Sequence, residues 1–450
     1  MSKAIKIKRG ADIKLFGEAE QKIDVAAKSS VVALKPDDFF GMIPKLSFKE
    51  GAEIKAGSPL FFDKKNDKIK FTSPVSGELV EVRRGAKRKI LEVKVLADSE
   101  TRYEKFTPWN GGGKREDLVD TMLSMGLWPF LKQRPYGVIA NPDDTPRDIF
   151  ISLYNSAPLA PEASFILKER QEDVKVALAA LNALTGGSVH VGIKHGDNSF
   201  DNLEGVTKHY VKVPHPAGNV GVLIHHVSPI NKGEVVWTVN GLDLPIIGKS
   251  LRSGEFHAER LVALVGSEVE GPQFFETIVG AQMKSIIGDK LKSDNVRIIS
   301  GDPLTGSAVE SEGHLGFYDS QVTVLPEGNA KKFFLTDGWL APGINRFSLS
   351  KAYPSWLMPG KRYKLDTNLN GEKRAFVVTG ELEKVFPFDI YPMQLIKSIM
   401  VNDIDAMEKL GIYEVIPEDF ALCEFACTSK IDIQNVVEQG IADLRKEFES

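Results

Sequence analysis

The two cysteines of the chain, Cys423 and Cys427, lie in one short stretch with three residues between them. In the C-x2-C-x2-C-x3-C-P run that binds iron–sulfur clusters, these positions supply the third and fourth thiolates. Pro417 and Phe420 occupy the first and second positions. Because a cubane cluster needs four thiolates and the chain has two cysteines, the stretch has the pattern of a cluster motif that has lost its metal. The alternative is a helix on which two cysteines pack as small apolar side chains.

Length and charge limit the possible classes of protein. A chain of 450 residues is expected to form roughly three or four domains. The net charge of −4, with Lys and Arg spread along the chain, argues against nucleic acid as a partner. Two cysteines, and no secretory segment in Met1–Gly10, favour the cytosol. No apolar run approaches the ~18 residues that span a bilayer, the best being short predicted strands such as Val220–Val227.

Short alternating strands are predicted from Ala4 to Leu34, and two glycine-punctuated strand segments follow. From about Phe39 to Leu96 these segments resemble the two halves of a biotinyl/lipoyl barrel-sandwich domain. Such domains carry a prosthetic group on a hairpin lysine, which here would lie in Asp63–Asp67. That turn lacks the Asp-Lys-Ala and Met-Lys-Met contexts of modified lysines, so we interpret it as a solvated charged turn.

A glycine-rich boundary, Thr107–Arg115, precedes a region of alternating helices and strands. It lacks the feeding strand and the Lys-Ser/Thr ending of a phosphate-binding loop. Beyond it the spacing predicts helices at Asp117–Gly126 and Val174–Leu184, and strands at Val138–Ala140, Val189–Ile193, Thr207–Val213, Gly221–His226 and Val235–Val239. This order predicts a mainly parallel sheet, but no G-x-G-x-x-G follows its first strand, so nothing supports a dinucleotide site.

Histidines in this region have two interpretations. The segment His215–Gly221 is either a binding loop or a Pro/Gly turn. His225 and His226 are adjacent on a predicted strand and would point to opposite sides, so they would not chelate one ion together.

From His257 the pattern predicts a strand-strand-helix-strand unit of the β-grasp, ubiquitin-like kind. Its elements are Arg260–Gly266, Phe274–Val279, a helix near Gly280–Gly288, and Val296–Ile299. Further strands are predicted at Gly313–Pro326 and Lys331–Pro342, before an aromatic, loop-rich stretch, Trp339–Pro359. Pro387–Met400 opens a helical tail that ends with the helix Asp432–Phe448.

The predicted fold class is multidomain α/β plus α+β. Its five units are N-terminal strands with a barrel-sandwich (1–106), a degenerate Rossmann-like α/β domain (107–256), a β-grasp (SLBB-like) domain (257–311), a β-rich connecting region (312–380), and a helical domain with the degenerate cluster motif (381–450).

Six short motifs, taken together with this domain order, point to a family. They are Lys70–Gly77 (KFTSPVSG), Arg83–Arg88 (RRGAKR), His215–Gly218 (HPAG), Arg297–Gly306 (RIISGDPLTG), Gln321–Gly328 (QVTVLPEG) and Leu422–Cys427 (LCEFAC). The chain resembles the flavin- and cluster-bearing NADH-oxidising subunit of respiratory complex I and the C subunit of the Rnf complex. Over essentially its whole length it is most similar to the A subunits of sodium-translocating NADH:quinone oxidoreductases.

The resemblance implies a subunit that has given up its cofactors. In flavin-bearing relatives the segment matching Gly126–Arg134 is a glycine-rich loop that closes on the flavin. Here it holds Leu127, Trp128, Pro129 and Phe130, which would fill the space of the isoalloxazine ring. The family therefore implies a chain with no tightly bound cofactor, flavins and iron–sulfur clusters being carried by partner subunits. It also implies a peripheral position on the cytoplasmic face of the bacterial inner membrane, beside a membrane-embedded subunit.

The family further implies a role in quinone binding and in holding the complex together. A quinone needs aromatic or aliphatic contact and one or two hydrogen-bond donors at its carbonyl groups. The predicted site takes its apolar surface from two loops and its donors from the second; its residues are Phe39, Phe40, Met42, Trp128, Phe130, Arg134 and Tyr136. The alternative is that these aromatic residues join one domain to the next.

Two other functions are weighed against this one. An Rnf-type electron-transfer subunit with flavin and clusters is disfavoured by the missing loop glycines and by Pro417 and Phe420. A biotinyl or lipoyl carrier is disfavoured by the context of Lys64 and Lys65.

Overall fold

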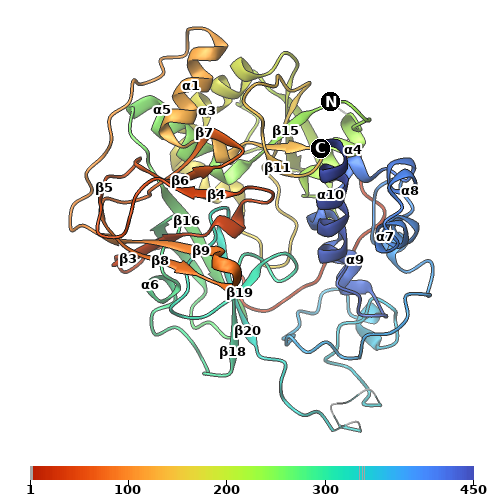
Figure 1. Ribbon diagram of the computed structural model, residues 1–450. Helices are drawn as coiled ribbons and strands as arrows, with labels where there is room; N and C mark the ends of the chain where they lie inside the picture. Colours follow the sequence, from red (N-terminus) through yellow and green to blue (C-terminus); the bar gives the residue numbers. More distant parts are fainter. Residues whose placement is uncertain (1–3, 334, 337, 339, 450) are drawn as a thin grey trace.

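The computed structural model describes residues 4–333, 335, 336, 338 and 340–449. Four sheets, of seven, six, four and three strands, form the body of the molecule among these residues. The C-terminal helices pack along one side of that body, and the two termini lie near each other in the view of Figure 1. No helix in the described part of the chain is both long enough and apolar enough to cross a membrane.

The seven-stranded sheet is the centre of the α/β region. Its strand order is β1 (Ile5–Lys6), β14 (Thr207–Lys212), β13 (Val189–Lys194), β12 (Ile149–Ser152), β15 (Val236–Asn240), β10 (Lys132–Arg134) and β11 (Val138–Ile139). The first five strands are parallel, and β10 and β11 close one edge in antiparallel pairing. The helices of the region are α1 (Arg115–Met125), α2 (Ala163–Ile166), α3 (Gln171–Leu184), α4 (Val220–Val227) and α5 (Leu244–Ser253). The predicted parallel sheet is therefore confirmed, although its central strand β12 and helices α2 and α5 were not predicted.

Helix α4 corrects one prediction. Residues 221–226 were predicted to be a strand, and they form a helix that begins after Asn219. A run of eight mostly apolar residues does not distinguish a buried strand from a buried helix. The deciding factor is topology, because the parallel strands β14 and β15 lie on opposite sides of β12 and need a crossover between them. His225 and His226 are therefore helical neighbours, and the argument that they point to opposite faces of a strand does not hold.

The barrel-sandwich region consists of two small sheets. One contains β3 (Val31–Leu34), β9 (Ile90–Ala97), β8 (Gly77–Arg84) and β5 (Glu53–Ile54), and the other β4 (Pro44–Leu46), β6 (Pro59–Asp63) and β7 (Asn66–Thr72). The hairpin between β6 and β7 turns at Lys64 and Lys65, as predicted, and the Asp63 carboxylate accepts a hydrogen bond from the Lys65 N–H group within the turn.

Five strands of the six-stranded sheet come one after another along the chain. They are β16 (Glu259–Val265), β17 (Gln273–Ile278), β18 (Val296–Ser300), β19 (Ser307–Val309) and β20 (Gln321–Pro326). The strand-strand-helix-strand order is present, with helix α6 (Met283–Ile287) after β17. Strand β2 (Glu20–Val25), from the N-terminal part of the chain, pairs with β17 and completes the sheet. Strands β1, β2 and β3 thus belong to three different sheets.

The predicted strand Gly313–Pro326 is present over its second half as β20. The described residues of 327–380 contain no strand, so the predicted strand Lys331–Pro342 is wrong for those of its residues that are described; Phe334, Asp337 and Trp339 lie outside the described residues. The regular element of 327–380 is the 3-10 helix η6 (Pro354–Leu357). The helical tail is present, with α7 (Pro392–Met400), α8 (Ile404–Lys409), the 3-10 helix η9 (Pro417–Phe420), α9 (Ala421–Ala426) and α10 (Ile433–Glu449).

Candidate functional site

A cavity of about 360 Å³ lies where β12 and β15 end. Ser152 and Asn240, the last residues of these two strands, both line it. From β12 the chain adds β13 and then β14 on one side, and β15 follows on the other side of β12, so the order of the parallel strands reverses between β12 and β15. Open parallel sheets bind their ligands at such a switch point, outside the carboxyl ends of the strands.

The cavity walls come from three parts of the chain. The α/β region supplies the strand ends and the loop before α4, the segment after β18 supplies a second wall, and η9 supplies the third. The lining residues used below are Phe130, Lys132, Arg134, His215, Gly218, Asp243, Tyr318 and Glu418. Since the walls come from distant parts of the sequence, their packing is what forms the cavity.

The loop before α4 is held tightly against the end of β12. The hydroxyl group of Ser156 lies 3.0 Å from His215 Nδ1 and accepts a 2.8 Å hydrogen bond from the Gly218 N–H group. A Cβ atom on Gly218 would lie 2.4 Å from the carbonyl oxygen of Tyr154, so this position requires glycine. Burial lowers the pKa of His215, which keeps its imidazole neutral at pH 7. The HPAG segment is thus a tight turn, and His215 and Gly218 of this turn line the cavity.

Arg134 is a buried residue that lines the cavity. Its Nη1 lies 2.6 Å from Asp419 Oδ2 and also donates to the carbonyl oxygen of Glu414, and the side chains of Arg134 and Asp419 are 1% and 0% exposed. Its Nη2 is buried and has no hydrogen-bond partner among the described residues. An unpaired buried N–H group costs about 1–3 kcal/mol, so a ligand acceptor there would remove that cost.

Asp419 also meets the start of α4. A Cβ atom on Gly221, in the first turn of this helix, would lie 2.4 Å from Asp419 Oδ1. The partly positive helix N-terminus therefore has a carboxylate of the C-terminal region against it. This contact joins η9 to the α/β region beside the cavity.

Other charged groups at the cavity were not predicted. Lys132 Nζ lies 3.6 Å from the ring centre of Tyr318, and burial lowers the pKa of Lys132. Burial raises the pKa of Asp243 to about 6, although Arg260 Nη2 lies 2.6 Å from its carboxylate. Burial also raises the pKa of Glu418. Of these groups, only Lys132 could have been found from the sequence. It lies two residues before Arg134 on a strand, and residues two apart on a strand share a face.

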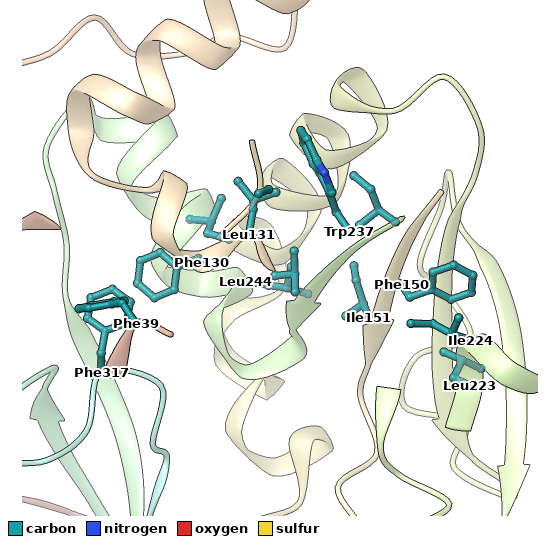
Figure 2. Close-up of a cluster of buried hydrophobic side chains, with 14 of the residues drawn as sticks. Phe39, Phe130, Leu131, Phe150, Ile151, Leu223, Ile224, Trp237, Leu244 and Phe317 are labelled. Atoms are coloured by element: carbon teal, nitrogen blue, oxygen red, sulfur yellow. The ribbon is translucent and has the colours of Figure 1, made fainter. Parts of the chain in front are cut away.

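The predicted aromatic residues divide between the cavity and the core. Phe130 lines the cavity, and its ring centre is 4.8 Å from that of Phe317, which is 4.9 Å from that of Phe39. Figure 2 shows Phe39, Phe130 and Phe317 lying together. Trp128 is fully buried, and its Nε1 donates a 2.7 Å hydrogen bond to the carbonyl oxygen of Ala140.

The remaining predicted residues do not line the cavity. Phe40 and Met42 are partly buried and pack against the main hydrophobic core. The ring of Tyr136 is 6.3 Å from that of Tyr413. The structure therefore brings Phe130 and Arg134 to the cavity and leaves the other five predicted residues out of its lining.

The two cysteines lie within the helical tail. Cys423 and Cys427 are free, 0% and 2% exposed, and part of the main hydrophobic core. Burial raises the pKa of the Cys423 thiol well above its usual value, so this thiol is neutral. Phe420, at the second position of the predicted motif, stacks on Phe386 with 4.7 Å between ring centres. In the described part of the chain no three or more His, Cys, Asp and Glu side chains are grouped to bind a metal ion.

These features define a class of protein: an α/β core with a cavity at the point where its parallel strands change order, lined in part by a helical tail, with barrel-sandwich and mixed-sheet units attached. The A subunit of the Na(+)-translocating NADH-quinone reductase of Hahella chejuensis is 36% identical over 98% of this chain and 100% of its own length. The chain belongs to this family, NqrA.

Further comparisons agree with this assignment. Residues 5–98 match the NqrA N-terminal barrel-sandwich hybrid domain, 113–256 the NqrA second alpha/beta domain, and 261–311 the NQRA C-terminal domain. The corresponding proteins of Neisseria meningitidis serogroup B and Vibrio alginolyticus are each 34% identical, over 98% of this chain and all of theirs. A solved chain of an NAD+-reducing [NiFe]-hydrogenase aligns at 11% identity and a TM-score of 0.37, over 75% of this chain and 62% of that one, which is too distant to support an argument.

Proposed function

We propose that this chain is a peripheral subunit of a sodium-pumping NADH:quinone oxidoreductase, in which it binds the quinone headgroup and helps to assemble the complex. The names of its relatives support the complex. The observation that carries the quinone site is the unpaired Nη2 of Arg134 at a cavity that Phe130 also lines. We place the protein on the cytoplasmic face of the membrane, beside a membrane-embedded partner.

The chemistry of the cavity suits a quinone ring. Phe130 and Tyr318 offer aromatic surface, and Arg134 offers an N–H group to one carbonyl oxygen. Lys132 is a second donor on the same face of β10. Of the other predicted residues, Phe39 is connected to Phe130 through the ring of Phe317, whereas Phe40, Met42, Trp128 and Tyr136 do not line the cavity.

The proposed role needs no catalytic residue and no cofactor on this chain. Electrons would reach the quinone from flavins and iron–sulfur clusters on partner subunits, so this chain supplies binding and orientation. In support, the chain has two cysteines, both buried, where a cubane cluster needs four thiolates. We also propose that the unit at 257–311 is a β-grasp domain, as its strand-strand-helix-strand order suggests.

Replacement of Arg134 by lysine tests the donor. Lysine keeps the positive charge beside Asp419 but removes the second nitrogen. Since a hydrogen bond from a charged donor contributes about 1.5–3 kcal/mol, we expect the dissociation constant for a short-chain ubiquinone to rise at least about tenfold. Quenching of tryptophan fluorescence or calorimetry on the isolated chain measures it.

Two further variants complete the experiment. Arg297→Lys, in an ion pair with Glu327 remote from the cavity lining, is the matched control and should bind quinone normally. Phe130→Ala should also weaken binding, because it removes an aromatic ring that lines the cavity. Unchanged affinity in both Arg134→Lys and Phe130→Ala would rule out this location for the site.

A further inference from the structure

A basic segment follows β20. Residues 331–378, here called the basic arm, contain nine Lys and Arg and three Asp and Glu. The arm therefore carries a net charge of +6, and since the whole chain carries −4, the rest of the chain carries −10. The nearly balanced total hides this local excess. In Figure 1 the chain leaves the body of the molecule after β20 at the lower edge of the view.

The basic arm also concentrates exposed apolar side chains. It is 48 of the 450 residues, yet it holds nine of the 21 exposed large apolar side chains of the described chain. Trp356 is 56% exposed and Leu357 is 63% exposed. Scattered exposed apolar residues are ordinary, so their concentration along one segment sets the basic arm apart from the rest of the described chain.

The structure presents Trp356 and Leu357 on an anchored turn. They end the 3-10 helix η6, where the buried Ser355 side chain accepts a hydrogen bond from the Ser348 N–H group and donates one to its carbonyl oxygen. Tyr363, close behind, is 4% exposed and forms a β-bridge with Leu15. The contacts of Ser355 and Tyr363 with the rest of the protein thus hold the exposed Trp356 and Leu357 in place.

Several cations of the basic arm are unneutralised. Arg362 and Lys364 pair with carboxylates of the body, Glu18 and Glu268. Others have no carboxylate partner within the part of the chain that the structure describes; they are Lys331, Lys351, Lys373 and Arg374. Unpaired cations beside exposed apolar groups suit a partner surface of opposite charge.

We propose that the basic arm is the docking surface for another subunit of the complex, one that presents an apolar pocket for Trp356 and Leu357 surrounded by carboxylates. This inference rests on the proposed role as a component of a complex. A large aromatic anchor within a charged surround is typical of the residues that dominate protein–protein affinity.

The backbone of the basic arm favours a protein partner over a lipid surface. Between β20 and Leu382 its one regular element in the described residues is the four-residue η6. Many backbone N–H and C=O groups therefore lack partners within a helix or a sheet. A bilayer interior cannot satisfy such groups, whereas another protein can pair with an extended segment.

The experiment uses the whole complex. It is purified from membranes through an affinity tag on another subunit, and the amount of this chain that is retained is measured by quantitative mass spectrometry. We expect Trp356→Ser with Leu357→Ser, and separately Lys351→Glu with Lys373→Glu, to lower retention about tenfold or more. The controls are Val25→Ser, at an exposed apolar side chain outside the basic arm, and Lys64→Glu, in the β6–β7 hairpin.

Two measurements on the isolated chain make the result decisive. If the arm variants keep the unfolding temperature and the quinone affinity of the parent chain, their loss of retention in the complex is a loss of docking. Failure of the quinone site and failure of the docking surface are therefore distinguishable. Full retention of both arm variants would overturn the proposal. The proposal would also be overturned if the parent chain floated with phosphatidylglycerol vesicles and the arm variants did not, because the arm would then be a lipid-binding surface.

Discussion

At the scale of single residues, burial changes the protonation of carboxylates near the cavity. Asp38 accepts a hydrogen bond from the Phe317 N–H group and lies 3.7 Å from Lys35 Nζ, yet burial raises its pKa to about 6. A raised folded-state pKa means that the folded chain holds this proton more tightly than the unfolded chain does. The stability that this gives is complete below about pH 4 and is lost as the pH rises through 6.

Replacement of Asp38 by asparagine tests this effect. Asparagine cannot ionise, so the difference in unfolding free energy, variant minus parent, should increase by about 2 kcal/mol between pH 4.5 and pH 7. Urea unfolding at the two pH values measures it. Asp37→Asn, at a neighbouring exposed side chain paired with Lys89, is the control. A difference that stays constant across this range would show that Asp38 is not protonated in the folded chain.

At the scale of elements, the contact between α4 and η9 joins the helical tail to the α/β region. Gly221 is buried in the first turn of α4, where it lets the carboxylate of Asp419 approach the helix. Glycine inside a helix costs about 1 kcal/mol relative to alanine. The buried ion pair of Asp419 with Arg134 lies beside the same contact.

Replacement of Gly221 by alanine should break this contact. The new methyl group would lie 2.4 Å from Asp419 Oδ1 and displace it, leaving Arg134 as an unpaired buried charge. We expect a loss of about 3 kcal/mol in unfolding free energy, together with weaker quinone binding. Gly186→Ala, where the nearest atom would be 3.9 Å away, is the control and should cost little. Equal stability of the two variants would contradict the close packing of η9 on α4.

At the scale of the whole molecule, the N-terminal strands connect the domains. Strand β1 is an edge of the seven-stranded sheet, and β2 is an edge of the six-stranded sheet. Between them, Asp12 accepts a hydrogen bond from the His215 N–H group at the cavity, and Leu15 bridges to Tyr363. One short stretch of chain therefore contacts the cavity loop, both large sheets and the basic arm.

Deletion of residues 1–19 should destabilise the whole molecule. It removes three buried apolar side chains, those of Ile7, Ile13 and Leu15, as well as β1. At about 2 kcal/mol for each side chain, the unfolding temperature should fall by roughly 6 °C. Differential scanning calorimetry measures it, and deletion of residues 1–3 alone is the control. A loss confined to one of several transitions would show that the N-terminal strands stabilise a single domain.

The sequence by itself determined the elements with strong local signals and the family. The helix at 117–126, strands β13 and β14, the elements β16, β17, α6 and β18, and the β6–β7 turn were predicted from periodicity and turn residues. The relatives confirmed the family that the motifs had indicated. These features depend on residues close together in the chain, which is why local patterns reveal them.

Only the tertiary structure decided which residues form the cavity. Phe130 and Arg134 were predicted from one loop. Lys132, Asp243 and Glu418, in contrast, meet at the cavity only because the neighbouring strands β12 and β15 end side by side and η9 packs against α4. The same long-range packing made residues 221–226 a helix rather than a strand. Contacts between residues more than a hundred positions apart have no local signature, because their free energy arises only when distant surfaces are buried together.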